Sequence, residues 1–237
     1  MQQNPPNDSG LAQALQLRPA RCDEPEWRLR LELAACYRLV DWHGWSELVF
    51  NHITARLPGP PDGERRFLIN ALGLHYGEIT ATNLVCIDRS GNVLDGSGSE
   101  VNRAGFIIHG AIHGARDDAH CILHTHTTAG MAIACQQGGL RNDNFYSIML
   151  DGRIAYHDFE GEVTDPSEGP RLVANLGRRN LLILRNHGLL AIGRSVAQMY
   201  LAYWTLERAC QIQMAADSIA GPHVELPASV IAQSPAR

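Results

Sequence analysis

The chain has 237 residues, 45% of them hydrophobic, and its 20 basic and 25 acidic side chains give a formal net charge of −5. This composition can bury a full core, and no run of basic residues is present to bind nucleic acid or an anionic membrane. No apolar run reaches membrane-spanning length, and the polar, proline-containing start does not resemble a signal peptide. We therefore expect a cytoplasmic protein that binds a small molecule, with neither nucleic-acid nor membrane partners.

The six cysteines are far apart in the sequence, and none forms a CxxC pair. Most lie in apolar surroundings, which is typical of buried, reduced thiols in a cytosolic protein. We therefore expect no disulfide framework.

The ends of the chain differ from its middle. Residues 1–25 carry prolines and amides with little periodicity, which predicts a flexible tail, and the proline-containing segment 218–237 is interpreted as a second tail. Nothing within residues 26–217 has the composition of a linker. This range is therefore predicted to be one domain.

Helical and strand patterns follow each other along the first half of this domain. Apolar residues at helical spacing predict a helix over 26–42. Near-alternation over 48–56, a run of turn formers and the segment 65–70 predict a β-hairpin. A strand, a Ser-Gly-Asn turn and a second strand are expected over 83–96.

The second half continues with strands and single helices. An apolar helical stripe after Asn102 precedes the short buried strand "CILHTH" and then the helix "TAGMAIACQQGG", ended by its double glycine. A short helix from Pro170 to Gly177, two apolar runs around a turn in "NLLILRNHGLLAIG", and a long helix with Ser195 as N-cap follow. Short connections between strands predict an α/β fold with a mostly antiparallel sheet covered by helices.

Two histidines stand one residue apart at the end of a predicted buried strand, in "CILHTHTTAG". Side chains two apart in a strand point to the same face, about 6.5 Å apart along the chain, so His124 and His126 can converge on one ion. A catalytic zinc needs three protein ligands and an open position. Two structural histidines with ordinary partners are the alternative interpretation of the pair.

His187 is the candidate for the third ligand. It lies at a turn between two apolar strands, where Gly188 would let the backbone bend and expose the ring at a sheet edge. His109 and His113 compete, since residues four apart share a helix face, but "HGAIH" lacks the glutamate of HExxH and a structural role is favoured. We interpret the other histidines within the domain as structural: His52, His75, His120 and His157.

Several segments in combination resemble the class II aldolase/adducin family: "HTHTTAGMAIA", "AYHDFEG", "LLILRNHGLLAIG", "ERACQIQ", "NHITAR" and "INALGLHYGEIT". The resemblance spans about residues 28–216 and is greater to the adducin-like branch than to the sugar-phosphate aldolases. It implies a three-layer α/β/α domain with a central, mostly antiparallel sheet, commonly a homotetramer with active sites between subunits. It also implies that His124, His126 and His187 bind a divalent metal, usually Zn²⁺, which would polarise a substrate carbonyl or enediolate.

The catalytic side chains of the family aldolases are only partly matched. The resemblance places a glutamate four residues before His109, where this chain has Gly105. Glu100 is the nearest carboxylate and would replace it if the helix start were shifted; otherwise it is an ordinary acidic residue near a helix N-terminus. Tyr146 falls at the spacing of a catalytic acid that some family aldolases contribute across the subunit boundary, with a structural tyrosine as the alternative.

The phosphate-binding positions of the family aldolases are also altered. They correspond here to Asn51-His52, Leu72-Gly73 and the "SGS" before Glu100, so hydroxyl and amide donors are lost at two of three positions. A sugar phosphate is therefore not the first substrate we expect.

Two functions follow from this pattern. The first is a divalent-metal-dependent lyase, aldolase- or decarboxylase-like, acting on a small carbonyl or carboxylate compound. The second is a non-catalytic, adducin-like oligomeric scaffold, which the missing glutamate favours and which keeps much of the same histidine set. Because the chain lacks the long neck and basic tail by which adducins bind actin and spectrin, we favour the lyase.

Overall fold

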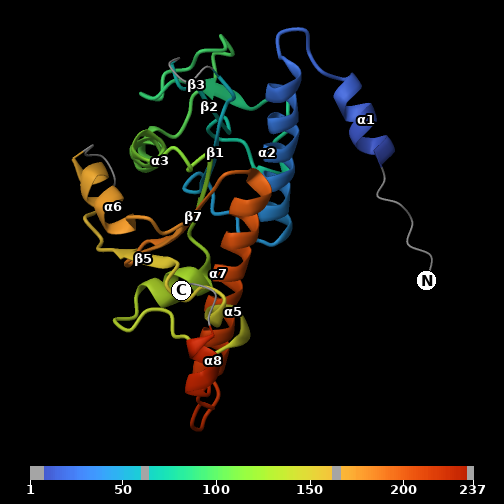
Figure 1. Ribbon diagram of the computed structural model, residues 1–237. Helices are drawn as coiled ribbons and strands as arrows, with labels where there is room; N and C mark the ends of the chain where they lie inside the picture. Colours follow the sequence, from blue (N-terminus) through green and yellow to red (C-terminus); the bar gives the residue numbers. More distant parts are fainter. Residues whose placement is uncertain (1–7, 60–63, 162–166, 234–237) are drawn as a thin grey trace.

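A single open sheet lies at the centre of the computed structural model, which describes residues 8–59, 64–161 and 167–233. Its strand order is β3-β2-β1-β4-β7-β6-β5, and all neighbours are antiparallel except β5 and β6 (Figure 1). The mostly antiparallel sheet expected from the sequence is thus confirmed. The strands are β1 (His52–Arg56), β2 (Phe67–Ile69), β3 (Val85–Ile87), β4 (Cys121–Thr125), β5 (Ile154–His157), β6 (Leu181–Leu184) and β7 (Gly188–Gly193).

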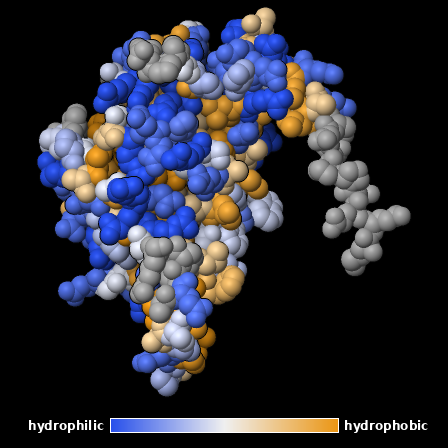
Figure 2. Space-filling model, in the orientation of Figure 1, coloured by the Kyte–Doolittle hydropathy of each residue, from blue (hydrophilic) through white to orange (hydrophobic). Residues whose placement is uncertain are grey.

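Helices cover both faces of the sheet. In the described residues they are α1 (Asp8–Gln16), α2 (Glu24–Trp42), the 3-10 helix η1 (Tyr76–Glu78), α3 (Arg103–Ala115), α4 (Thr128–Ala134), α5 (Phe145–Ile148), α6 (Glu168–Leu176), α7 (Val196–Asp217) and α8 (Ala228–Ala232). Helices α3 and α6 pack on one face, and α2, α4 and α7 on the other, which gives three α/β/α layers (Figure 1). In the space-filling view, hydrophilic side chains cover much of the upper left, and hydrophobic ones gather to the right and near the lower tip (Figure 2).

Strand β4 lies at the middle of this architecture and contributes to both apolar cores. Ile122 belongs with Ile112 of α3 to one core, whereas Leu123 belongs with Tyr203 of α7 to the other. Because side chains alternate along a strand, His124 lies on the same face as Ile122, towards α3. The side chain of His124 therefore lies between the sheet and the helix layer that contains α3.

Helix ends follow the sequence signals in most places. The Asp23 carboxylate accepts a hydrogen bond from Glu26 N at the start of α2, and the Ser195 hydroxyl accepts one from Gln198 N at the start of α7. Gly177 ends α6 with φ +55°, a conformation that a side chain disfavours. The predicted N-cap of the long helix is confirmed.

Five local expectations are corrected. The expected N-terminal tail contains α1, which accepts a hydrogen bond from Trp27 Nε1 at Ala14 O (2.8 Å), and the expected C-terminal tail contains α8; residues 1–7 and 234–237 lie outside the described residues. The second strand expected in 83–96 shrinks to one bridge, Ile87 to Val93, because the Asp95 carboxylate accepts the Cys86 N–H. Helix α4 ends before the double glycine, and α6 begins before Pro170.

Two global expectations can be compared with the described residues. All six cysteines are unpaired, and five of them are buried. Within the part of the chain that the structure describes, none of the helices combines the length and the apolar character that crossing a membrane requires.

Candidate metal centre

Three histidines meet where β4 ends and β7 begins. His124 is in β4, His126 follows the strand directly, and His187 lies in the turn between β6 and β7. β4 and β7 are antiparallel neighbours, with Thr125 opposite Leu189, so this register brings the turn beside the end of β4. One potential ligand atom from each of the three side chains lies within 4.8 Å of the others. The structure thus brings together the three residues predicted as a metal site.

Hydrogen bonds set the orientation of the deepest ring. His124 Nδ1 lies 2.9 Å from the carbonyl oxygen of Leu189, so this nitrogen donates its N–H and Nε2 carries a lone pair. His124 Nε2 is 2.8 Å from His126 Nε2, an approach in which a proton on His126 bridges two basic nitrogens. A divalent cation would satisfy both lone pairs once that proton is displaced, so this donor set fits a metal such as Zn²⁺.

Burial keeps the three imidazoles neutral, which is the form that binds metals. Desolvation lowers the pKa of His187 to about 4 and that of His124 well below its ordinary value, with smaller contributions from neighbouring histidines. Burial also lowers the pKa of His126, although the Glu47 carboxylate partly opposes this. The lone pairs of all three rings are therefore available at neutral pH.

Gly188 is needed at this centre for a different reason from the expected one. The left-handed residue of the turn is Asn186, with φ +56°, whereas Gly188 is not in that region. A Cβ at position 188 would lie 2.5 Å from Thr125 O, 3.0 Å from His126 Cδ2 and 3.3 Å from His124 Cε1. The glycine thus permits close approach of the turn to β4 and to two ligand rings.

A chain of hydrogen bonds between buried side chains lies behind the cluster, between β1 and α3. His113 Nδ1 donates to Ala119 O (2.7 Å), so its Nε2 accepts from the Thr54 hydroxyl (2.8 Å). The Thr54 oxygen in turn accepts from His109 Nδ1 (2.8 Å), which leaves His109 Nε2 as a lone pair. Both nitrogens of His113 are occupied, so this residue does not compete as a ligand.

Two buried acceptors in this region have no hydrogen-bond partner among the described residues. They are Nε2 of His52 and Nε2 of His109, whose ring centroids are 4.2 Å apart. The His52 ring also lies edge-on to His124, at 5.1 Å. Desolvation lowers the pKa of His52 to about 3 and that of His109 well below its ordinary value. The neutral rings of His52 and His109 therefore lie behind the predicted ligand His124.

Most of the chain matches a known protein family. The model of the class II aldolase and adducin N-terminal domain matches residues 31–214. The chain belongs to the class II aldolase and adducin family.

Relatives in this family differ in their described roles. A Pseudomonas aeruginosa protein named provisionally as a class 2 aldolase is 46% identical over 213 residues, covering 90% of this chain and 81% of its own length. Alpha-adducin of Rattus norvegicus is 42% identical over 202 residues, covering 84% of this chain and 27% of the adducin. The solved L-fuculose 1-phosphate aldolase of Glaciozyma antarctica has a TM-score of 0.78 and 30% identity, covering 93% of this chain and 86% of its own.

His52, which the sequence predicts to be structural, borders the candidate metal centre, because its ring lies edge-on to His124. It also fills the space in front of position 105, where the family resemblance implies a glutamate. A Cβ on Gly105 would lie 2.6 Å from His52 Nδ1 and 2.7 Å from His52 Cε1. The cross-strand pairing of His52 with His124 could have indicated this, had the register been known.

The two proposed catalytic side chains lie outside the histidine cluster. Glu100 is exposed in the loop before α3, where its backbone oxygen accepts from Leu72 N (2.8 Å). Tyr146 is half-buried on α5 and packs edge-on against Trp204 of α7, with ring centroids 5.6 Å apart. Within the described part of one chain, the candidate metal-binding group comprises the three histidines alone.

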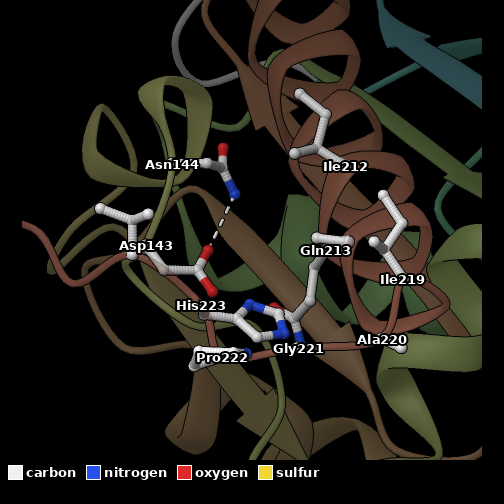
Figure 3. Close-up of a pocket in the computed structure, with 11 residues that line it drawn as sticks. Asp143, Asn144, Ile212, Gln213, Ile219, Ala220, Gly221, Pro222 and His223 are labelled. Carbon is white, nitrogen blue, oxygen red and sulfur yellow. Dashed lines mark hydrogen bonds between the residues drawn. The ribbon is translucent and has the colours of Figure 1, made fainter.

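A separate pocket of about 330 Å³ lies at the C-terminal end of α7 (Figure 3). Its lining includes Asp143, Gln213 and His223, and none of the three predicted ligands. Its polar groups are already engaged: Arg141 pairs with Asp143 and Asp217, and His223 lies 3.4 Å from Asp217. The acidic groups at this pocket are thus paired with Arg141 or lie beside His223.

Lowering the pH is expected to destabilise the fold, because His113 is buried in its neutral form. Burial, opposed by the hydrogen bond to Ala119 O and aided by the nearby charge of Arg56, lowers its pKa to about 3, against about 6.5 in an unfolded chain. Below pH 6.5 the unfolded chain binds more protons, so the contribution of His113 is complete above that pH and is lost as pH falls towards 3. Between pH 7.5 and pH 5 this loss amounts to about 2 kcal/mol. Urea titrations at both pH values, repeated on His113→Phe, measure it; an unchanged pH dependence in the variant would contradict the assignment.

Proposed function

We propose that this class II aldolase family member is a divalent-metal-dependent lyase that acts on a small carbonyl or carboxylate compound. The observation that supports the proposal is the convergence of His124, His126 and His187, with the lone pair of His124 fixed by its bond to Leu189. Zn²⁺ is the proposed metal, because three neutral imidazoles leave its charge uncompensated and its fourth position open. The name of the L-fuculose 1-phosphate aldolase relative supports the lyase class.

The ligand residues would supply different parts of the site. When bound, the metal would polarise a substrate carbonyl and stabilise the carbanion left by C–C cleavage. His124 forms the buried base of the site, and His126 and His187 are partly exposed, so the substrate would approach from their side. The Asn51 side-chain oxygen accepts from His126 N (3.2 Å), which holds the residue at the strand end.

Proton transfer is the part of the proposal that needs further residues. We assign it to Glu100, by movement of the loop before α3, and to Tyr146, acting on the site of a neighbouring subunit in a homotetramer. Both assignments extend the sequence interpretation. A decarboxylase needs a single proton donor to the carbanion, so it would make less demand on the missing carboxylate than an aldolase.

An adducin-like scaffold is the second candidate. It is favoured by the 42% identity to alpha-adducin and by Gly105, which leaves the helix without the expected glutamate. Since the chain covers 27% of alpha-adducin, the similarity concerns one domain of that protein. In this case a bound metal would have a structural role and no substrate would be turned over.

Metal content tests the first step of the proposal. Protein purified without chelators or a metal-affinity tag is expected to contain about one ion per chain, and His124→Ala to retain almost none, because two imidazoles hold a divalent ion far more weakly than three. His223→Ala, which removes a partly exposed histidine beside Asp217, is the matched control and should keep the ion. Full occupancy in His124→Ala would refute the ligand assignment.

Turnover tests the second step. We expect the metal-loaded protein to cleave or decarboxylate at least one member of a panel of hydroxy-keto and β-keto acids, and His187→Ala to lose at least a hundredfold in rate. Inactivity of a fully metal-loaded wild type across the panel would favour the scaffold.

A further inference from the structure

The opening of the histidine cluster is bordered by exposed apolar side chains. The Phe50 ring centroid lies 6.3 Å from that of His126, and the Phe159 ring centroid lies 6.0 Å from that of His187. These are the two partly exposed predicted ligands, and both phenylalanines are themselves more than half exposed. An apolar ring therefore stands beside each ligand that faces the approach to the metal.

The loop that carries Phe50 also exposes Leu48 and Val49. Leu48 is 81% exposed and has φ +46°, a conformation that costs a leucine about 1–2 kcal/mol. We call Phe50 and Phe159 the apolar rim, because their rings lie beside the two partly exposed ligand rings.

Hydrogen bonds hold this loop in place. Asn51 Nδ2 donates to Trp45 O (2.6 Å), and Asn102 Nδ2 donates to Val49 O (3.0 Å). The same Asn102 side chain accepts from Gly105 N at the start of α3. The loop is therefore anchored to the helix and, through the oxygen of Asn51, to His126. The backbone on either side of Phe50 is therefore held in place relative to His126.

We propose that the apolar rim binds the side chain of the substrate, so that the preferred substrates are hydroxy or keto acids that carry an aromatic or branched apolar group. This inference rests on the proposed function, because the acid group would be held by the metal. The rim lies against the two partly exposed ligand rings, so a compound that chelates the metal would place its substituent on Phe50 or Phe159. Burying such a group against phenyl rings is favourable.

The charge near the opening disfavours a phosphate at the same place. Glu47 lies in the same loop, three residues before Phe50, and its carboxylate is exposed. The first-turn donor of α3 at Gly105 is already bonded to Asn102. A phosphate dianion placed against the rim would meet apolar rings next to a loop that carries an exposed carboxylate, whereas a phenyl or isopropyl group would not require any charged partner.

Matched small acids test the inference on the Zn²⁺-loaded full chain. Mandelate and glycolate share the chelating 2-hydroxy-acid group and differ by one phenyl ring, and 3-phosphoglycerate keeps that group but carries a phosphorylated CH₂ in place of the ring. By calorimetry we expect mandelate to bind at least tenfold more tightly than glycolate, and 3-phosphoglycerate no more tightly than mandelate. Phe50→Ala and Phe159→Ala should each weaken mandelate roughly tenfold and leave glycolate unchanged. Leu201→Ala, an exposed apolar control on α7, should change neither.

Several outcomes would overturn the inference. Equal binding of mandelate and glycolate by a metal-loaded protein would remove the preference while leaving the proposed metal site intact. If the two phenylalanine variants convert an oligomer into monomers and keep the mandelate-to-glycolate ratio, the rim is a contact between copies of the chain. A protein that takes up no Zn²⁺ by elemental analysis would overturn both this inference and the proposed function.

Discussion

Replacing Gly188 with alanine is expected to destabilise the fold and to weaken metal binding in one step. The added Cβ would lie 2.5 Å from Thr125 O, a backbone atom of the central strand β4, so the turn must move away from β4. Such overpacking in a buried sheet costs about 2–3 kcal/mol. The same Cβ would approach His126 Cδ2 at 3.0 Å and His124 Cε1 at 3.3 Å, so both ligand rings must shift. Denaturant titration and elemental analysis of one preparation measure the two effects.

The control for this prediction is Gly138→Ala. Gly138 has no atom within 4 Å of an added Cβ and is not in the left-handed region, so the free energy of unfolding and the metal content should both stay near wild type. A stable Gly188→Ala protein that keeps its ion would show that the β6–β7 turn can move without disturbing the ligands. The close approach of turn and strand would then not be part of the metal centre.

Local patterns were sufficient to predict most of the fold. The apolar runs on either side of "RNHG" gave two strands and a turn, and the Ser195 signal gave the start of the last long helix, because such features depend on residues close in sequence. The second strand expected over 83–96 failed for a tertiary reason. The Asp95 side chain takes the backbone donor of Cys86 that a regular ladder would have used.

The candidate ligands could be predicted from the sequence, but the groups that surround and orient them could not. HxH at a strand end and the HG turn could be recognised from spacing, and the structure places their rings together. Which nitrogen of His124 faces the site depends on the carbonyl of Leu189, 65 residues away in the chain. The position of His52 against Gly105 likewise depends on how α3 packs on β1, and no local pattern reports that distance.

Gly105→Ala is the second change with a large expected effect. Its Cβ would lie 2.6 to 2.8 Å from three ring atoms of His52. That ring cannot swing aside freely, because it packs against the rings of His109 and His124. We expect a loss of about 1–3 kcal/mol in the free energy of unfolding. In the background of His52→Ala the space is open, so the same substitution should become neutral or slightly stabilising through its higher helix propensity.

The double-mutant cycle of His52 and Gly105 tests whether the histidine occupies the place of the expected glutamate. Gly110→Ala is the control within the same helix: its nearest neighbour is a Phe106 ring atom at 3.2 Å, so it should cost little and show no coupling to His52→Ala. Coupling of at least about 1 kcal/mol for Gly105, absent for Gly110, would establish the contact. Glutamate at position 105 should then be accommodated only together with a smaller residue at position 52. Additivity of the two changes would contradict the steric conflict between the His52 ring and a side chain at position 105.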